Sequence, residues 1–329
     1  MGGDFAPGNV VAGAVEALRA AENRFEVILI GQEDRVNAEL TRHQTDGLAL
    51  KVVHASEVVG MDDSPTTAIK QKKNSSITLG LTLQKEHRAE AFVSAGNTGA
   101  VMSASTLILG RMNGVGRPTM GAFLPSENGF CLLLDAGANV DCRPQHLLEF
   151  GIMGSIYAQH MMGYEKPTVG LLSVGEESSK GNSLTLEAHR MFAESGLNFV
   201  GNVEGRDILK GKSHVVVCDG FVGNVVLKFA ESVLSLLKKR LRDYASQDIF
   251  RKVWMAMTYR TLKNVLKDFD YQEHGGVPLL GVQGVSIIGH GGSTPKAIRN
   301  MILKAEEIVR REVTLHMQKA LAKRQSSLV

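Results

Sequence analysis

Short apolar runs alternate with helical patterns along this chain of 329 residues, and each run ends in a loop that carries glycine. Runs rich in valine, leucine and isoleucine are typical of strands buried on both faces. They lie at residues 27–30, 91–94, 131–135, 169–172, 215–218 and 286–289. Helical patterns lie at residues 98–109, 144–159, 183–194, 223–241 and 294–312. This alternation predicts an α/β fold with a largely parallel sheet.

The composition is that of a globular protein with a full core, because 43% of the residues are hydrophobic and 22% are charged. No internal repeat or proline-rich linker marks a boundary, so we predict one domain over residues 1–329 with an inserted amphipathic helical hairpin at residues 231–271. In open sheets of this kind, ligands bind at the carboxyl ends of the strands. The polar motifs of this chain follow the predicted strands.

Several classes of function are disfavoured by the composition. The three cysteines have no paired spacing, and we find no signal peptide and no apolar run long enough to cross a bilayer, which favours a reducing cytoplasm. Without a CxxC or HExxH pattern, neither a metal site nor a cofactor is predicted. Aromatic residues make up 5% and the net charge is +3, so nucleic acid is not an expected partner.

The motif SAGNTG at residues 94–99 lies where a predicted strand ends and a predicted helix begins. Free N–H groups of the first helical turn and the positive end of the helix dipole make such a loop a seat for an anion. Gly96 and Gly99 permit close backbone approach, while Asn97 and Thr98 add side-chain donors for a phosphate or a thioester oxygen. A plain tight turn with a helix cap is the alternative.

The motif LLLDAGANVD at residues 132–141 runs from an apolar strand into a loop with Asp135, Asn139 and Asp141. Beside a phosphate site, carboxylates are better suited to orienting a lysine, an arginine or an amide than to touching the anion. Two carboxylates in a loop are a weak signal for magnesium, so the motif does not change the prediction that no metal is bound.

The motif GEESSKGN at residues 175–182 places Lys180 beside a glycine at the start of a predicted helix, with Asn182 close behind. An ammonium group in this position can meet phosphate oxygens or a developing oxyanion. The acidic residues of the motif are expected to be exposed. Position alone therefore favours a functional role for Lys180.

The motif CDGFVGNVVLK at residues 218–228 has Asp219 and Gly220 in its turn and places Asn224 and Lys228 one helical turn apart. Its cysteine, Cys218, could carry an acyl group as a thioester. A cysteine that ends an apolar strand is more often buried, and no histidine partner is fixed by the sequence, so we disfavour this chemistry.

The motif IIGHGGS at residues 287–293 places His290 in a glycine-rich loop between a strand and a helix. Phosphate contact and general acid catalysis are both open to it. Lesser anion-binding candidates are KKNSS at residues 72–76 and Arg117. Together, the motifs predict these substrate-binding residues: Gly96, Asn97, Thr98, Gly99, Asp135, Asn139, Asp141, Asn182, Asp219, Gly220, Lys228, His290 and Gly291.

The motifs stand in a fixed order along nearly the whole chain: MGGDFAPG, KKNSS, SAGNTGA, GRP, LLLDAGANVD, GIMGS, GEESSKGN, CDGFVGNVVLK and GHGGS. In this order they resemble the phosphate acyltransferase PlsX family of bacterial phospholipid synthesis. The resemblance implies a three-layer fold similar to the phosphotransacetylase and isopropylmalate dehydrogenase class. It implies transfer of a fatty acyl group from acyl carrier protein to inorganic phosphate, by a cytoplasmic homodimer that works with a membrane glycerol-3-phosphate acyltransferase.

The resemblance also makes Lys180 and Asn224 the leading catalytic candidates. We expect backbone N–H groups at residues 96–99, with Lys180 and His290, to hold phosphate while Asn224 donates to the thioester oxygen. The amino end departs from the family pattern, which has a strand and an aspartate before MGGD. We therefore expect that a first strand is missing from this sequence.

The segment at residues 231–271 has apolar residues at helical spacing, which predicts two amphipathic helices. These residues are Val233, Leu236, Leu237, Leu241, Tyr244, Phe250, Val253, Trp254, Met257, Leu262, Val265, Leu266 and Phe269. Lysines and arginines at positions 238, 239, 240, 242, 251, 252, 260, 263 and 267 add a basic face, which suits acidic acyl carrier protein or anionic lipid headgroups at a peripheral membrane contact. A dimer-forming or core-packed helix pair is the alternative.

Three other functions fit parts of the sequence. A phosphotransacetylase acting on acetyl coenzyme A shares the chemistry but has no need of a basic amphipathic hairpin. A nicotinamide dehydrogenase would need a GxGxxG loop with a downstream acid, which this chain lacks. A non-catalytic scaffold that recruits lipid enzymes to the membrane would have no need of Lys180 and Asn224.

Overall fold

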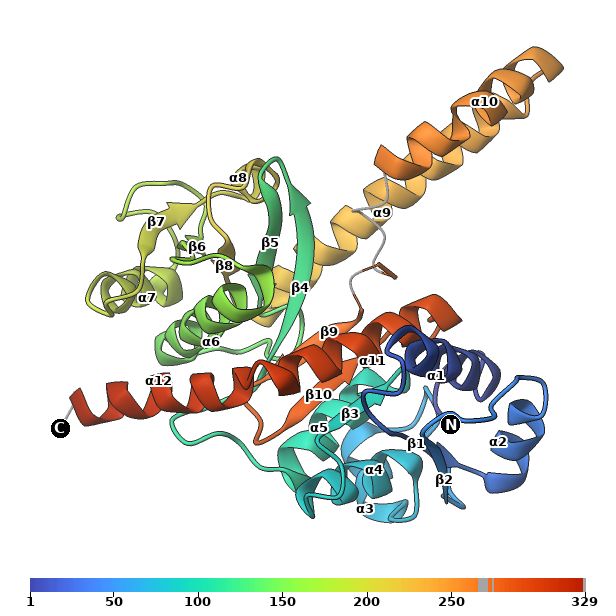
Figure 1. The fold of residues 1–329 in the computed structure, drawn as a ribbon. Coiled ribbons are helices and arrows are strands. Elements are labelled where there is room, and N and C mark those ends of the chain that lie inside the picture. The colour runs from blue at the N-terminus through green and yellow to red at the C-terminus, as the bar shows by residue number, and fades with distance from the viewer. Residues whose placement is uncertain (266–271, 274, 328–329) are drawn as a thin grey trace.

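The computed structural model describes residues 1–265, 272–273 and 275–327. In this part of the chain, eight strands form a central sheet in the order β3-β10-β9-β4-β5-β8-β6-β7, and β1 and β2 form a separate parallel pair (Figure 1). The strands are β1 (Val27–Gly31), β2 (Leu50–His54), β3 (Ala91–Ser94), β4 (Thr119–Ser126), β5 (Gly129–Leu134), β6 (Val169–Leu172), β7 (Phe199–Val203), β8 (Val215–Val217), β9 (Val277–Leu280) and β10 (Val285–Ile288).

The structure describes twelve helices. They are α1 (Gly8–Ala20), α2 (Glu33–Leu40), α3 (Pro65–Gln71), α4 (Ser76–Lys85), α5 (Thr98–Ile108), α6 (Pro144–Met162), α7 (Ser183–Ala193), α8 (Gly205–Lys210), α9 (Gly220–Ala245), α10 (Ile249–Val265), α11 (Pro295–Arg310) and α12 (Val313–Ser327). The predicted helices are all present, with ends that differ by a few residues.

Alternate residues of β5 show how the layers form. Leu132 and Leu134 join a core cluster with residues of α6, α11 and α12, whereas Cys131 and Leu133 join a second cluster against which α9 packs. Successive side chains of a strand point to opposite faces, so this strand is buried between two helical layers. The predicted three-layer α/β fold is confirmed.

The sequence reading missed β2, β4, β7 and β9. Two of them, β4 and β9, form the antiparallel centre of the sheet, where β9 pairs with β10 and β4, and β4 pairs with β5. The other ladders are parallel. An expectation built on β-α alternation overlooks strands that are joined by a tight turn, as β4 and β5 are.

The register determines where the two halves of the sheet end. The strands β3 and β10 run opposite to β5, β8, β6 and β7, because three antiparallel ladders separate them. Leu134, the last residue of β5, pairs with Gly121 of β4. The residue before Gly121 in β4, Met120, pairs with Leu279 of β9. Leu279 also pairs with Ser286 of β10. The carboxyl ends of β5 and β10 therefore lie at nearly the same level, in the middle of the sheet.

The helices α9 and α10 form a hairpin that projects from the body of the molecule (Figure 1). The two predicted amphipathic helices are thus confirmed, although α9 begins earlier than predicted. Leu266, Lys267 and Phe269 lie outside the described residues, as do the side chains of Arg260, Lys263 and Val265.

By length and composition alone, α9 is apolar enough to cross a membrane. The expectation that no apolar run reaches this length is therefore wrong, because two charged residues, Lys228 and Glu231, do not lower the mean hydropathy of the run enough. One such helix is weak evidence for a membrane span. Its first turns are part of the folded body, since Val226, Leu227 and Ala230 pack against a core cluster.

Candidate functional site

The start of α5 has the features of an anion seat. Asn97 caps the helix, with its Oδ1 accepting a hydrogen bond of 3.0 Å from the Ala100 N–H. Among the described residues, the backbone N–H groups of residues 97–99 have no hydrogen-bond acceptor. Thr98 is exposed and Gly99 is half-buried. The loop therefore has donors left for a ligand, as the motif predicts.

Four segments meet at this seat, and we call them the first loop set: residues 1–4, 57–64, 94–99 and 289–293. A Cβ on Gly2 would lie 2.8 Å from the Cα of Gly96, so the two backbones touch. The Asp4 N–H donates to the Gly291 carbonyl at 2.9 Å. Glycine is needed at these contacts because any side chain would separate the loops.

The side chain of Asn97 is bound within the protein. Its Nδ2 donates to the carbonyl oxygens of Gly60, Met61 and Asp63 at 3.2, 3.0 and 3.1 Å. We expected a donor free for substrate, whereas this amide, which is 7% exposed, holds residues 57–64 against the seat. A role of Asn97 in binding substrate remains a prediction.

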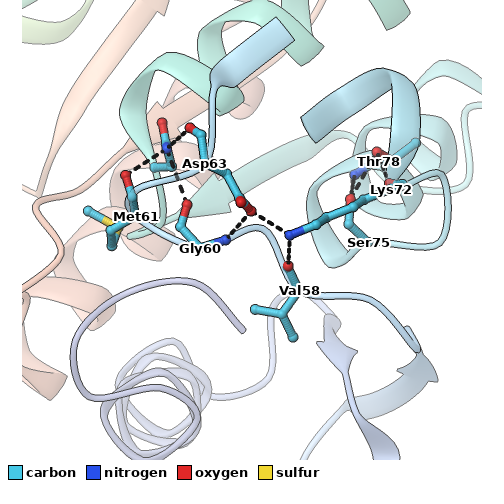
Figure 2. Close-up of polar contacts among 8 residues, drawn as sticks. Val58, Gly60, Met61, Asp63, Lys72, Ser75 and Thr78 are labelled. Atoms are coloured by element: carbon cyan, nitrogen blue, oxygen red, sulfur yellow. Dashed lines mark hydrogen bonds and ion pairs between the residues drawn. The ribbon is translucent and has the colours of Figure 1, made fainter. Parts of the chain in front are cut away.

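Lys72 is also occupied. Its Nζ donates to the Val58 carbonyl at 2.8 Å and to Asp63 Oδ2 at 2.5 Å, and the same oxygen accepts from the Gly60 N–H (Figure 2). The bond from Lys72, followed by that from Gly60, lowers the pKa of Asp63. The first lysine of KKNSS, Lys72, is therefore committed to an ion pair with Asp63 in this structure.

His290 and Gly291 lie on the other side of the seat, after β10. His290 is exposed, and its Nδ1 accepts a hydrogen bond of 3.1 Å from the Gly292 N–H. With Nδ1 as an acceptor, the neutral imidazole carries its proton on Nε2. Asn9 supports the loop by donating to the Ser293 carbonyl at 3.0 Å.

A second loop set comprises residues 135–141, 173–182 and 218–224, which follow β5, β6 and β8. Within it Asp135 is fully buried, and its two carboxylate oxygens accept from the backbone N–H groups of Met120, Ala138 and Asn139 and from the Asn139 side chain. Burial raises the pKa of Asp135, and these four hydrogen bonds oppose that shift. Asp135 therefore organises the loop and orients an amide, which is the role preferred for it above.

Asn139 completes that arrangement. It donates to the Pro118 carbonyl at 2.7 Å, and its own carbonyl accepts from the Gly220 N–H at 2.7 Å. The loops after β5 and β8 are thereby tied together. Asp141 is exposed at the end of its loop.

Asn224 lies on the first turns of α9, directly over the loop after β5. A Cβ on Gly137 would be 3.3 Å from the Oδ1 of Asn224, and one on Gly223 would be 1.9 Å from the Asp135 carbonyl oxygen. Asp219 caps α9 by accepting from the Val222 N–H at 2.9 Å. Gly223 thus lets the start of α9 lie against the backbone of Asp135, and this contact positions the exposed amide of Asn224.

Lys180 and Asn182 belong to the loop after β6, and both are exposed. Asn182 caps α7 through a bond of 2.9 Å from the Thr185 N–H. The Lys180 carbonyl accepts from Ser173 Oγ at 3.1 Å, which fixes the backbone beside the ammonium-bearing side chain. Among the described residues, no carboxylate lies within ion-pair distance of Lys180, in contrast to Lys228, which pairs with Glu231 at 2.8 Å.

The structure brings some of these predicted residues together and leaves others apart. Asn139, Gly220 and Asn224 meet at the joined ends of β5 and β8. Ala138 packs against the buried cluster that contains Val59, so the two loop sets border the same cluster. No hydrogen bond joins Lys180 to Asn224 in the described part of the chain; parallel pairing of β6 with β8 places their loops at one edge.

The cysteines are poor candidates for acyl chemistry. Burial raises the pKa of Cys131 to about 12 and that of Cys218 well above its ordinary value, so neither thiol readily gives a thiolate. Among the described residues, no cluster of histidine, cysteine, aspartate and glutamate side chains is placed to hold a metal ion. The prediction that no metal is bound remains a prediction.

Sequence reasoning missed the segment at residues 57–64. Its letters GMDDSP carry a turn signal, and a serine followed by proline is typical of a helix start, as found at α3. Nothing in those letters places the segment beside residues 94–99, because the Asn97 bonds join residues more than thirty positions apart. Only the fold reveals this contact.

Comparisons with known proteins agree with the motifs. The model of a family described as fatty acid synthesis protein matches residues 1–316. The phosphate acyltransferase of Pelotomaculum thermopropionicum is 49% identical over 309 residues, covering 94% of this chain and 90% of that protein. The phosphate acyltransferase of Chlorobaculum tepidum is 46% identical over 331 residues, covering 98% and 100%.

Among solved structures, the EutD phosphotransacetylase from Staphylococcus aureus matches 92% of this chain and 91% of its own, with a TM-score of 0.62. At 15% sequence identity this likeness shows the fold alone. The family model and the two relatives cover nearly the whole chain, the motif loops included. The chain therefore belongs to the family of phosphate acyltransferases.

Proposed function

We propose that this chain transfers a fatty acyl group from acyl carrier protein to inorganic phosphate, giving acyl phosphate for phospholipid synthesis. The observation that carries the proposal is the pair of loop sets that border one buried cluster. In the described part of the chain, the first set has N–H groups without an acceptor at residues 97–99, and the second has the exposed amide of Asn224. An anion and a thioester carbonyl can be bound together there. Family membership supports the same chemistry.

In the proposed reaction, a phosphate oxygen attacks the thioester carbonyl carbon, the C–S bond breaks, and the carrier thiol leaves as thiolate. The N–H groups of residues 97–99, with Lys180 and His290, hold the phosphate, and Asn224 donates to the carbonyl oxygen as it becomes an oxyanion. Phosphate is nucleophilic at neutral pH, so the protein contributes orientation rather than a strong base.

The remaining substrate-binding predictions divide by role in this proposal. Asp135, Asn139, Asp219 and Gly220 shape the loops after β5 and β8 through hydrogen bonds with each other or with nearby backbone. Asp141, Asn182 and Lys228 are exposed at the edge of the second loop set, where a large donor would meet them. The reaction as proposed uses no metal and no cofactor.

A separate observation supports the carrier and membrane parts of the proposal. Along the hairpin of α9 and α10, large apolar side chains are exposed, among them Phe229 at 69%, Phe250 at 84% and Trp254 at 53%. Lys238, Lys239, Arg240 and Arg242 are exposed nearby. Apolar and basic surface in one place suits an acidic carrier protein or an anionic lipid surface.

We further propose a single domain with the hairpin inserted, acting in the cytoplasm as a homodimer in peripheral contact with the membrane. A membrane glycerol-3-phosphate acyltransferase would consume the product. The exposed apolar side chains of the hairpin are compatible with contact to a second copy as well as to lipid. Sedimentation of the purified protein, with and without vesicles, distinguishes these contacts.

The test is incubation of purified protein with phosphate and one of three donors: palmitoyl-acyl carrier protein, palmitoyl coenzyme A or acetyl coenzyme A. Mass spectrometry follows acyl phosphate and free carrier. We expect palmitoyl phosphate from the carrier-bound donor. Product from acetyl coenzyme A alone would establish the phosphotransacetylase alternative, and no product from any donor would favour the scaffold.

A further inference from the structure

The segment at residues 57–64 is held more firmly than a surface connection requires. Three carbonyl oxygens, those of Gly60, Met61 and Asp63, accept from the one Asn97 amide. Asp63 adds a second constraint (Figure 2). Its Oδ2 accepts from the Gly60 N–H within the segment and from Lys72 beyond it. Its backbone is thus fixed relative to the anion seat at residues 97–99.

This fixed backbone presents a large apolar side chain at the seat. Met61 is 46% exposed, and its carbonyl is bonded to the residue that begins the seat. A Cβ on Gly291 would lie 3.1 Å from the Met61 methyl carbon, so the side chain reaches from the first segment to the loop after β10. Met61 therefore lies between the residue that caps the seat, Asn97, and the loop at residues 289–293.

An anion alone gives no reason for a methionine in this position. Exposed apolar surface is unfavourable, and the neighbouring residues of the segment, Asp62 and Asp63, are acidic. In acyl transfer to phosphate, the carbonyl carbon must come within bonding distance of a phosphate oxygen. The first carbons of the acyl chain then lie within a few ångströms of the seat, where a flexible thioether can cover them.

Three other large apolar side chains are exposed at the loop sets. Among described residues outside α9 and α10, the exposed large apolar residues are Phe5, Met61, Leu107, Val140, Val174, Val200, Leu209 and Leu315. Phe5 adjoins the first loop set, and Val140 and Val174 belong to the second. Met61 differs from these three because its backbone is bonded to the seat itself.

We propose that Met61 contacts the acyl chain of the donor and sets the preference for chain length, with Asn97 and the Lys72–Asp63 pair as positioning residues. This inference rests on the proposed function. Met61 acts on the apolar half of the substrate, whereas phosphate is held by the N–H groups of residues 97–99. The two halves of the substrate can therefore be perturbed separately.

The test compares Met61→Ala and Met61→Leu with the unaltered protein, using butyryl-, octanoyl- and palmitoyl-acyl carrier protein. For Met61→Ala we expect kcat/KM to fall about tenfold for the longer donors and less for butyryl, because a lost apolar contact discriminates by roughly this factor. The KM for phosphate should not change. Met61→Leu should retain most of the activity because it keeps an apolar side chain of similar size. The control is Leu107→Ala, which truncates an exposed apolar side chain at the far end of α5 and should have no effect.

A second variant tests the positioning residues without removing the contact. Lys72→Met keeps the length of the side chain and breaks the ion pair with Asp63, which lies near the surface. We expect the same selective loss on longer donors, about threefold, since a misplaced segment retains its methionine. Far-ultraviolet circular dichroism should be unchanged.

The outcomes separate the two levels of inference. If the unaltered protein makes no acyl phosphate from any donor, the proposed function fails and the role of Met61 with it. If it makes acyl phosphate and Met61→Ala keeps the same relative kcat/KM across the three donors, only the role of Met61 is overturned. An equal loss on all donors together with a raised KM for phosphate would also overturn it, because Met61 would then support the seat.

Discussion

Two regions of the molecule differ in how completely their side chains are paired within the protein. They are the joined ends of β5 and β8 and the hairpin of α9 and α10. At the strand ends, both carboxylate oxygens of Asp135 and the side-chain nitrogen of Asn139 have partners inside the protein, and glycines allow backbones to touch. Along the hairpin, Phe229, Phe250 and Trp254 remain exposed. The first region holds its shape unaided, and the second has apolar surface left for a partner. The single helix α9 belongs to both.

The largest effect is expected where α9 enters the first region. In Gly223→Ala the new Cβ would lie 1.9 Å from the Asp135 carbonyl oxygen, a backbone atom that cannot move aside. We expect a loss of at least about 4 kcal/mol in the free energy of unfolding, or no folded protein, because overpacking against buried backbone is among the most costly changes. Urea unfolding measures it.

Gly205→Ala is the matched control, since a Cβ there meets nothing within 4 Å. It should change stability by no more than about 0.5 kcal/mol. Equal stability of the two variants would show that the contact between α9 and the loop after β5 is loose.

The next effect concerns catalysis rather than folding. Asn224→Ala removes the amide proposed to stabilise the oxyanion, and kcat should fall about 10²- to 10³-fold, as when an oxyanion-hole donor is lost. Stability should change little because the side chain is exposed. Ser232→Ala, another exposed position on α9, is the control. Near-normal turnover of Asn224→Ala would remove this residue from the mechanism.

Much of the first region could be predicted from the sequence, because its strands are continuous apolar runs and its loops carry glycine at fixed places. The sequence favoured Asp135 as a residue that orients a lysine, an arginine or an amide, and in the structure the Asn139 amide donates to it. The use of the Asn97 side chain could not be predicted. Its partners come from a segment more than thirty residues earlier, and tertiary contacts of this kind leave no local pattern.

The central strands were missed for a related reason. Pro125 and Gly121 interrupt the apolar pattern of β4, and β9 is short and begins with a valine followed by proline. Their pairing partners define them as strands. The amphipathic pattern of α9 was correctly recognised, yet its apolar face has no partner that the sequence can name.

A buried lysine outside both regions makes the stability of the protein depend on pH. Burial lowers the pKa of Lys304, which lies in α11 over the ring of Phe123, to about 7. An unfolded lysine has a pKa near 10.4, so between about pH 7 and 10 the unfolded state binds more protons and stability rises with pH. Lys304→Met should therefore show a shallower rise in urea midpoint from pH 7 to 9 than the unaltered protein.

Both proteins contain the same cysteines, so titration of the thiols cancels in this comparison. The matched control is Lys239→Met, because Lys239 is exposed on the hairpin and should leave the rise unchanged. Parallel midpoint curves for the unaltered protein and Lys304→Met would show that Lys304 remains charged in the folded state, with hydrogen bonds that offset its burial.

The smallest effect on stability is expected on the hairpin of α9 and α10. Trp254 is 53% exposed, so Trp254→Glu should change the free energy of unfolding by no more than about 0.5 kcal/mol. The same change places a negative charge on the surface proposed to meet anionic lipid, and flotation with vesicles that contain anionic lipid should be lost. Trp254→Phe, which keeps an apolar ring, should still float.

Two results would contradict this prediction. If Trp254→Glu floats like the unaltered protein, the membrane contact is not made by this face. If the stability of Trp254→Glu drops and becomes dependent on protein concentration, a second copy covers the hairpin. Only the second result would mean that the apolar surface of α10 is covered by protein.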